Sequence, residues 1–247
     1  FSSKTPEKRA PNPFRRFLPP GAGGPRTLGT EAGMNQWVWD MRLADAELVD
    51  GSVLWGIARG PKVPPGTYRA RLSLDDWSQT VDFEIVPDPR LDTTAGDYQA
   101  QFELSKQAWS ALTESHEALS DLRDVRQQVE DLTERLEATG QGEGLEEAAD
   151  AVDTCLTAGD TDNYPVKSEA RQDVLNFTPK LDNQFLNLMV TIESADARPT
   201  AGSVTLYGDL RAQLDDLLAE LDGCLDTEVA AFNERVAEAG VPAVIVP

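Results

Sequence analysis

Two hydrophobic periods divide the chain into an earlier β part and a later helical part. Within residues 34–87 apolar and polar side chains alternate, as in antiparallel strands that cover a core on one face only. The alternation predicts strands over residues 35–42, 67–74 and 80–86, with the last two paired as a hairpin. Three strands are too few to close a sandwich, so we expect a small antiparallel β-sandwich that this chain leaves incomplete.

From residue 92 onward apolar residues recur every three or four positions, which predicts helices. Thr94, with Asp97 three residues on, is a good N-cap for a long first helix that ends at the glycines near residue 140. Further helices are expected over about 145–156, 180–194 and 203–239. In the last helix an apolar seam with four- and three-residue spacings is typical of an antiparallel bundle. The seam positions are Leu210, Leu214, Leu217, Leu221, Cys224, Glu228 and Ala231, widened by Leu225 and Phe232.

These patterns predict an α+β fold in which the β part precedes an antiparallel four-helix bundle. Residues 1–32 are rich in Pro and Gly, so we expect an extended linker there. Residues 33–90 then form the β-sandwich module, and residues 91–247 form the helical bundle. Residues 1–3 could be the tail of a further strand that lies upstream of the first residue.

The charge is strongly negative and unevenly spread. The net charge is −21, yet residues 1–30 hold six Lys or Arg against one acid. Such a surface repels phosphate backbones, which argues against a nucleic-acid partner. It is either an ordinary solvated surface or an adaptation to high salt. No run of 18 apolar residues exists, so we expect no membrane span.

Residues that could carry out chemistry are scarce. His116 is the single histidine, which removes most catalytic triads and most zinc sites, and we expect it to be solvated or at a rim. Cys155 and Cys224 match no metal or redox spacing, so no metal and no cofactor are expected. Both cysteines fall on apolar helix stripes. They could remain two buried thiols, or they could form a disulfide between the second and fourth helices.

Two acid–base pairs lie near the β part. Asp40 with Arg42, and Asp88 with Arg90, could in principle supply the paired carboxylates of a glycosidase. However, Asp40 alternates away from the apolar face, and Asp88 lies between two prolines at a domain junction. A structural ion pair or a turn is the better interpretation, and no catalytic residue is assigned.

Tryptophans offer a second possible site, because aromatic faces can stack on sugars. Trp37 and Trp39 point to one face of a predicted strand, so we expect both in the core. Trp55 lies in a long loop between strands and is the candidate contact for a ligand or a partner.

Several motifs together resemble one family. They are "GMNQWVWDMR", "PGTYRARLSL", "VPDPRLDTTAGDYQAQFEL", "VLNFTPKLDNQF", "SADARPTAGS" and "DTEVAAFNERVAEAGVPAV", and they cover residues 1–245. The chain resembles the C-terminal region of large bacterial and archaeal proteins that begin with a β-propeller of BNR (sialidase-type) or sortilin-like repeats, often labelled glycosyl hydrolase. The resemblance implies an Ig- or fibronectin-like domain over 33–90, followed by a helical bundle.

The resemblance also implies what this region lacks. Propeller repeats carry an Asp-box, Ser-x-Asp-x-Gly-x-Thr-Trp, and no such motif occurs here. We therefore expect a non-enzymatic accessory region, a mature product or a cut piece of a secreted or extracytoplasmic parent. Its partner would be the propeller of that parent or a separate chain. The alternatives are part of a glycoside hydrolase whose active site lies in the absent propeller, and a carbohydrate-binding module.

Overall fold

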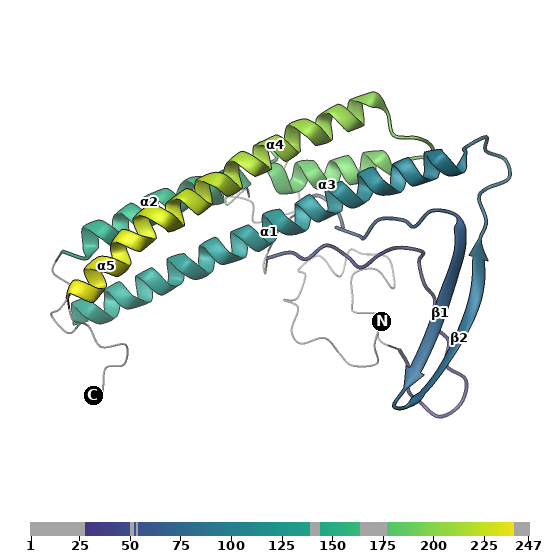
Figure 1. Ribbon diagram of the computed structural model, residues 1–247, viewed down its shortest axis with the longest axis horizontal. Helices are drawn as coiled ribbons and strands as arrows, with labels where there is room; N and C mark the ends of the chain where they lie inside the picture. The colour runs from purple at the N-terminus through teal and green to yellow at the C-terminus, as the bar shows by residue number, and fades with distance from the viewer. Residues whose placement is uncertain (1–27, 50–51, 53, 139–143, 164–176, 240–247) are drawn as a thin grey trace. The chain divides into compact units, whose positions relative to one another are not determined.

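The computed structural model describes residues 28–49, 52, 54–138, 144–163 and 177–239. Within these residues the fold is α+β, as predicted, with one two-stranded antiparallel sheet and four helical segments (Figure 1). Most of the predicted linker, the strand tail at residues 1–3 and the helix end near residue 140 lie outside the described residues.

The sheet is a long hairpin made of β1 (Gly66–Leu74) and β2 (Trp77–Ile85). Both strands and their antiparallel pairing were predicted, and the register places Leu74 opposite Trp77. Asp75 occupies the turn in a left-handed conformation (φ 48°), which aspartate tolerates better than most residues do. The predicted alternation therefore places the apolar side chains of both strands on one face.

The prediction of a third strand over residues 35–42 is wrong. Met41 has a left-handed backbone (φ 57°), which interrupts extended pairing, and the indole N–H of Trp39 donates to the carbonyl of Arg42 (2.8 Å). Pairing is confined to scattered bonds such as Leu43 N–H to Pro61 O (3.0 Å) and the single bridge between Arg42 and Lys62. Pro61 has no N–H to continue a ladder, so the segment stays irregular.

Backbone segments approach closely beside this irregular pairing. A Cβ at Gly60 would lie 2.2 Å from the carbonyl oxygen of Ala44, so only glycine fits there. Residues 41–46 and 56–63 are therefore folded tightly against each other before the chain enters β1.

The helices follow in the predicted order. They are α1 (Ala95–Ala138), α2 (Glu146–Asn163), α3 (Leu181–Ile192), α4 (Ala201–Cys224), a π-helical turn (Leu225–Val229) and α5 (Ala230–Glu238). The last three are continuous, so they correspond to the single helix predicted over 203–239. α2 runs beyond its predicted end near residue 156.

A reciprocal capping box begins α1. The hydroxyl of Thr94 accepts from the backbone N–H of Asp97 (3.2 Å), and the Asp97 carboxylate accepts from the N–H of Thr94 (3.1 Å). The predicted N-cap is thus confirmed.

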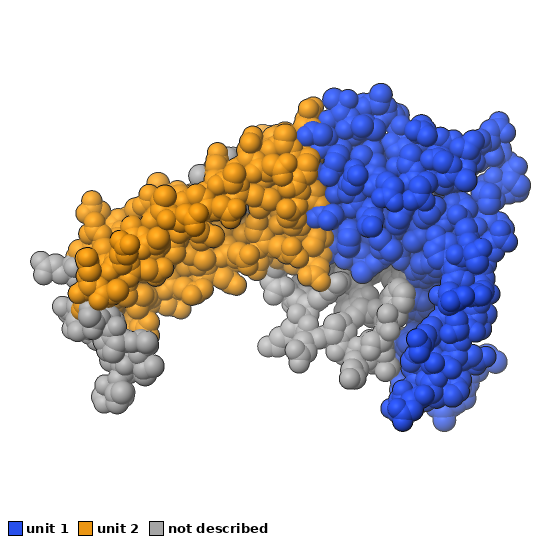
Figure 2. Space-filling model, in the orientation of Figure 1, with its two compact units in different colours: residues 1–46, 56–110, 185–208 blue, residues 47–55, 111–184, 209–247 orange. Residues whose placement is uncertain are grey.

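The chain forms two compact units that interleave along the sequence (Figure 2). Unit 1 comprises residues 1–46, 56–110 and 185–208, and it contains the hairpin. Unit 2 comprises residues 47–55, 111–184 and 209–247.

An apolar cluster fills unit 2, with side chains from α1, α2 and the α4–α5 helix. Its buried members are Leu122, Val129, Ala148, Val152, Leu156, Leu221, Cys224 and Phe232.

The π turn changes which residues of the last helix face this cluster. The predicted seam continued from Cys224 to Glu228 and Ala231, and Leu225 and Phe232 widened it. Ala231 and Leu225 are exposed, whereas Phe232 is buried as predicted, with Val229 packed against the cluster. A π turn accommodates one extra residue, so every following side chain is rotated by about 100° relative to a continuous α-helix. The rotation exchanges a small residue for a large apolar one in the core.

We predict that deleting Asp226 from the π turn leaves the protein folded, with stability within about 1 kcal/mol of wild type. The shortened chain can form a continuous α-helix in which Cys224, Val229 and Phe232 keep four- and three-residue spacings. Deleting Asp216 from the middle of α4 is the matched control. It should destabilise by several kcal/mol, because every later core residue turns away from the cluster. Equal stability losses in the two deletions, measured by urea unfolding, would contradict this role of the π turn.

Candidate functional site

A polar cluster in unit 1 centres on Glu193, the residue that follows α3. Its carboxylate accepts from the Arg42 guanidinium (2.5 Å), the backbone N–H of Lys62 (2.8 Å) and the hydroxyl of Ser105 on α1 (2.9 Å). The side chains of Arg42 and Glu193 are only 22% and 14% exposed. One carboxylate thus binds the irregular extended segment and α1 to the end of α3.

Neighbouring contacts strengthen the same junction. The ammonium of Lys62 pairs with Asp196 (2.8 Å), and the amide of Gln101 on α1 donates to the carbonyls of Ile192 (2.7 Å) and Ala195 (2.5 Å). The loop after α3 is therefore held on one side by the extended segment and on the other by α1.

The start of α1 is joined to the same loop. Arg198 pairs with Asp97 (2.7 Å). Hydrogen bonds from Thr94, together with that of Arg198, lower the pKa of Asp97 to about 2, so this carboxyl is ionised throughout the neutral range.

The cluster does not resemble a reaction centre. Lys62, Gln101, Phe102, Glu193 and Asp196 line a hollow of about 10 Å³, which is the space of one water molecule. Both carboxylates in it are paired with cations of this chain. A sugar ring does not fit in such a space, and the arrangement is that of a structural joint.

We predict that Glu193→Gln lowers the free energy of unfolding by roughly 3 kcal/mol, because it leaves the half-buried Arg42 without a counter-charge. Asp82→Asn, which removes the exposed pair of Asp82 with Arg69 on the hairpin, is the control and should cost less than about 1 kcal/mol. Urea denaturation followed by circular dichroism gives both values. Similar losses at the two positions would show that Glu193 has no special role.

The two predicted acid–base pairs make different contacts in the structure. Arg42 donates to Glu193, as described, and also to the carbonyl of Gly60 (2.9 Å). Asp88 pairs with Arg90 (2.6 Å) and accepts from its backbone N–H (3.0 Å), which makes a local turn on the surface. The structure places both arginines in structural contacts, and sequence reasoning missed Glu193 because its partners lie far away along the chain.

Trp39 lies over the base of the hairpin in unit 1. Its ring makes edge contacts with the rings of Tyr68 and Phe83, the two aromatic residues paired across β1 and β2. The ring centroids are 5.8 Å apart for Tyr68 and 6.2 Å apart for Phe83. This is a packing role, although Trp39 and Trp37 are half-buried rather than fully enclosed. Trp77, by contrast, is 51% exposed near the tip of the hairpin.

His116 lies in the interior of unit 2, so the prediction of a solvated rim histidine is wrong. Only 2% of it is exposed, because it lies on the same face of α1 as Leu112 and Leu119. Its Nδ1 accepts from the backbone N–H of Val49 (3.2 Å), which requires the neutral ring. Burial lowers the pKa of His116 to about 4, and the charge of Arg123 adds to the effect.

We predict that the contribution of His116 to stability is lost in acid. Its folded-state pKa lies below the unfolded value of 6.5, so the unfolded state binds a proton first and this contribution falls as pH drops from about 6.5 to 4. Asp182, whose pKa is raised on folding, contributes in the opposite sense and is common to wild type and variant. His116→Asn keeps an acceptor for Val49 but cannot titrate, so the stability of wild type relative to this variant should fall by roughly 3 kcal/mol over this range. Parallel pH profiles for wild type and variant would contradict the assignment.

The candidate contact residue Trp55 also belongs to unit 2. It is 37% exposed, and its backbone N–H donates to the side-chain carbonyl of Asn183 (2.9 Å). Asn183 in turn donates to Asp182, whose second carboxyl oxygen is buried without a partner. Burial raises the pKa of Asp182 to about 7, against the opposing hydrogen bonds from Asn183. His116 and Asn183 thus hold Val49 and Trp55, respectively, to the helices of unit 2.

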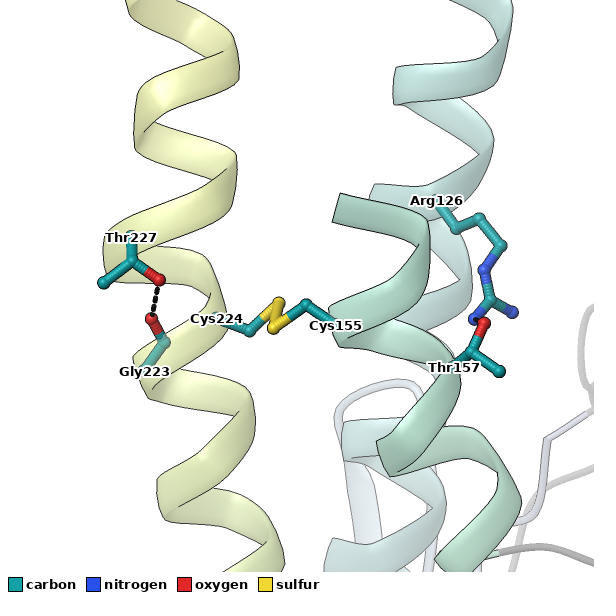
Figure 3. Close-up of a disulfide and its surroundings, with 6 residues drawn as sticks. All are labelled: Arg126, Cys155, Thr157, Gly223, Cys224 and Thr227. Atoms are coloured by element: carbon teal, nitrogen blue, oxygen red, sulfur yellow. Dashed lines mark hydrogen bonds between the residues drawn. A yellow bond between two sulfur atoms is a disulfide. The ribbon is translucent and has the colours of Figure 1, made fainter. Parts of the chain in front are cut away.

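Cys155 on α2 and Cys224 at the end of α4 form a disulfide, with Cα atoms 6.0 Å apart (Figure 3). The bridge lies directly before the π turn, where the hydroxyl of Thr227 donates to the carbonyl of Gly223 (2.8 Å). On the other side of α2, Arg126 links α1 to Asp153 (2.9 Å) and Thr157 (3.1 Å). α2 is therefore held covalently to α4 and by polar contacts to α1.

We predict that Cys155→Ala with Cys224→Ala lowers the free energy of unfolding by roughly 4 kcal/mol, because the bridge closes a long loop in the unfolded chain. Reductant should destabilise wild type and leave the double variant unchanged. Alkylation without reductant, followed by mass spectrometry, tests the bridge itself. Two modified thiols in protein made under oxidising conditions would refute it.

Among the described residues no group of three or more His, Cys, Asp and Glu side chains is placed to hold a metal ion. In the same part of the chain no helix has the length and apolar character needed to cross a membrane. Comparisons with protein-family models, curated proteins and solved structures find no match to this chain.

Proposed function

We propose that the chain is a non-catalytic accessory region whose work is to bind another polypeptide through its hairpin. The observation that carries this proposal is the exposed apolar face of β1 and β2. Leu72, Leu74, Trp77 and Val81 are 55%, 68%, 51% and 57% exposed, and they project from the same side of the hairpin.

Two general properties of proteins explain why the exposure of this apolar face indicates an interaction site. A two-stranded hairpin is at best marginally stable in water, and it needs further strands or a packed layer to bury its apolar face. Contiguous apolar surface on a protein marks an interaction site more often than scattered apolar residues do. Polar residues at the Glu193 joint, by contrast, are satisfied within unit 1 and leave no group positioned for catalysis.

The resemblance described above supports a choice of partner. It points to a β-propeller, either in the same parent protein or in a separate chain, and to a secreted or extracytoplasmic parent. The Cys155–Cys224 disulfide fits an oxidising compartment. A propeller is itself built of β-sheets, which suits an apolar hairpin face.

A photo-crosslinking amino acid at Leu72, introduced in the parent protein in its native host, tests this proposal. We expect adducts with propeller peptides. The same probe at Gln213, an exposed position on α4, should give none. Adducts with a glycan would favour a carbohydrate-binding module, and equal yields at both positions would reject the hairpin as the interface.

We further predict that the purified chain hydrolyses neither sialosides nor other glycosides. The Glu193 hollow is too small for a sugar, and Asp88 is held in a surface ion pair with Arg90. Fluorogenic glycosides provide the assay. Turnover that Asp40→Asn or Asp88→Asn abolishes would contradict the non-catalytic assignment.

A further inference from the structure

Both strands of the hairpin are edge strands. Within the described residues the sheet consists of β1 and β2 alone, so each strand has a row of backbone N–H and carbonyl groups that no neighbouring strand pairs. A two-residue turn joins the paired residues Leu74 and Trp77. Residues that flank such a turn exchange backbone hydrogen bonds with each other, and every second residue beyond them points its backbone groups outward. The outward-pointing residues of β2 are therefore Ser78, Thr80, Asp82 and Glu84.

The segment that leads into β1 already has a neighbour. Leu43 donates its backbone N–H to the carbonyl of Pro61 (3.0 Å), and Val63 donates to the carbonyl of Met41 (2.8 Å). In the part of the chain that the structure describes, β2 pairs with β1 alone, and eight of its nine residues are exposed. β2 is therefore the more open edge for a further strand.

The edge of β2 lacks several features that keep edge strands from pairing with other chains. A proline, a lysine or a bulge commonly has this role. β2 reads WSQTVDFEI, which contains neither proline nor lysine, and its register with β1 is unbroken over nine residue pairs. Its remaining protection is the negative charge of Asp82 and Glu84. An extended peptide of suitable charge can therefore pair along the whole strand.

The two strands carry opposite charges. β1 contains Arg69 and Arg71 and no acid, whereas β2 contains Asp82 and Glu84 and no base. Arg69 pairs with Asp82 across the polar face (2.7 Å), but the side chain of Asp82 remains 58% exposed. A strand added at β2 places its own side chains directly beside Asp82 and Glu84. Opposite charges at such cross-strand positions stabilise a sheet, and like charges destabilise it.

This distribution of charge indicates which strand fits. β2 of a second copy would bring like carboxylates together, and two chains with a net charge of −21 repel each other. β1 of a second copy alternates suitably, but pairing of β1 with β2 is head to tail and leaves an open-ended assembly. A basic strand from a different polypeptide is attracted instead. Its intervening residues lie beside Val81 and Phe83, so apolar side chains suit them.

We propose that the partner supplies a β-strand that pairs with the outer edge of β2, with lysine or arginine at alternate positions and apolar residues between them. This inference rests on the proposed function and deepens it, because it names the chemistry of the partner segment. Backbone hydrogen bonds supply the affinity, and the alternating side chains supply the specificity. The added strand also gives the sheet three strands, the number from which a sheet with one apolar face is stable.

A synthetic peptide takes the place of the partner in the test, so the result does not depend on the propeller. The peptide TKVKVKVKT is added to the full chain at physiological ionic strength, and amide hydrogen exchange is followed by NMR. We expect saturable one-to-one binding that slows exchange of Thr80 and Asp82 at least tenfold and leaves Arg69 and Arg71 unchanged. Protection along β1 instead of β2, or an unprotected hairpin, would overturn the proposal.

Two modified peptides separate strand pairing from attraction by charge alone. The same peptide with methylated backbone nitrogens keeps its charges but cannot donate hydrogen bonds, and the peptide TEVEVEVET keeps the donors but reverses the charge. Both should bind at least tenfold more weakly. Equal binding of the methylated peptide would overturn strand pairing, and equal binding of the acidic peptide would overturn the choice of a basic partner.

Thr80→Pro and Thr67→Pro form a matched pair, because each removes one outward N–H, from β2 and β1 respectively. Proline is tolerated at such edge positions. Thr80→Pro should weaken binding of the basic peptide at least tenfold, and Thr67→Pro should change it less than twofold. Equal effects of the two substitutions would contradict binding at β2.

The proposed function can fail separately from this inference. Peptide binding at β2 without propeller adducts at Leu72 would reject the propeller and support the strand site. Propeller adducts without peptide binding at β2 would support the interface and overturn the basic strand. Sedimentation velocity of the chain alone covers the remaining occupant, since oligomers that grow with concentration and disappear in Thr80→Pro would assign this edge to a second copy and overturn the proposal.

Discussion

The carboxylate of Glu193 is the interaction on which unit 1 depends. It accepts hydrogen bonds from Arg42, Lys62 and Ser105, which come from segments far apart in the sequence. An irregular extended segment has few backbone bonds of its own, so this charge holds it against α1 and α3. β1 begins at Gly66, directly after this segment, and the anchored segment therefore determines where the hairpin starts.

A second constraint, on the hairpin itself, leads from structure to function. Two strands give every apolar side chain a cross-strand neighbour but cannot provide the opposite layer. Trp39 supplies that layer over Tyr68 and Phe83, and the rest of the face needs a cover. Binding of another polypeptide through this face is the function that we propose for it.

The sequence predicted features that depend on local physics. Alternation along residues 67–86 was sufficient for the hairpin, and the Thr94–Asp97 pair was sufficient for the start of α1. Features that depend on distant partners were missed. No neighbouring residue in the sequence indicates the role of Glu193, and the sequence does not show that the face of α1 carrying His116 is buried. The π turn escaped prediction because a continuous three- and four-residue pattern accommodates both Ala231 and Phe232, and only packing shows that Phe232 alone is buried.

The central claim, that the exposed apolar face of the hairpin binds another polypeptide, is tested most directly by hydroxyl-radical labelling of side chains. Trp77 and Leu72 are the residues to follow, in the isolated chain and in the parent protein in its native host. We expect fast labelling of both residues in the isolated chain and labelling several-fold slower in the parent protein, with Trp39 unchanged. Equally fast labelling of Trp77 and Leu72 in both samples would contradict this claim.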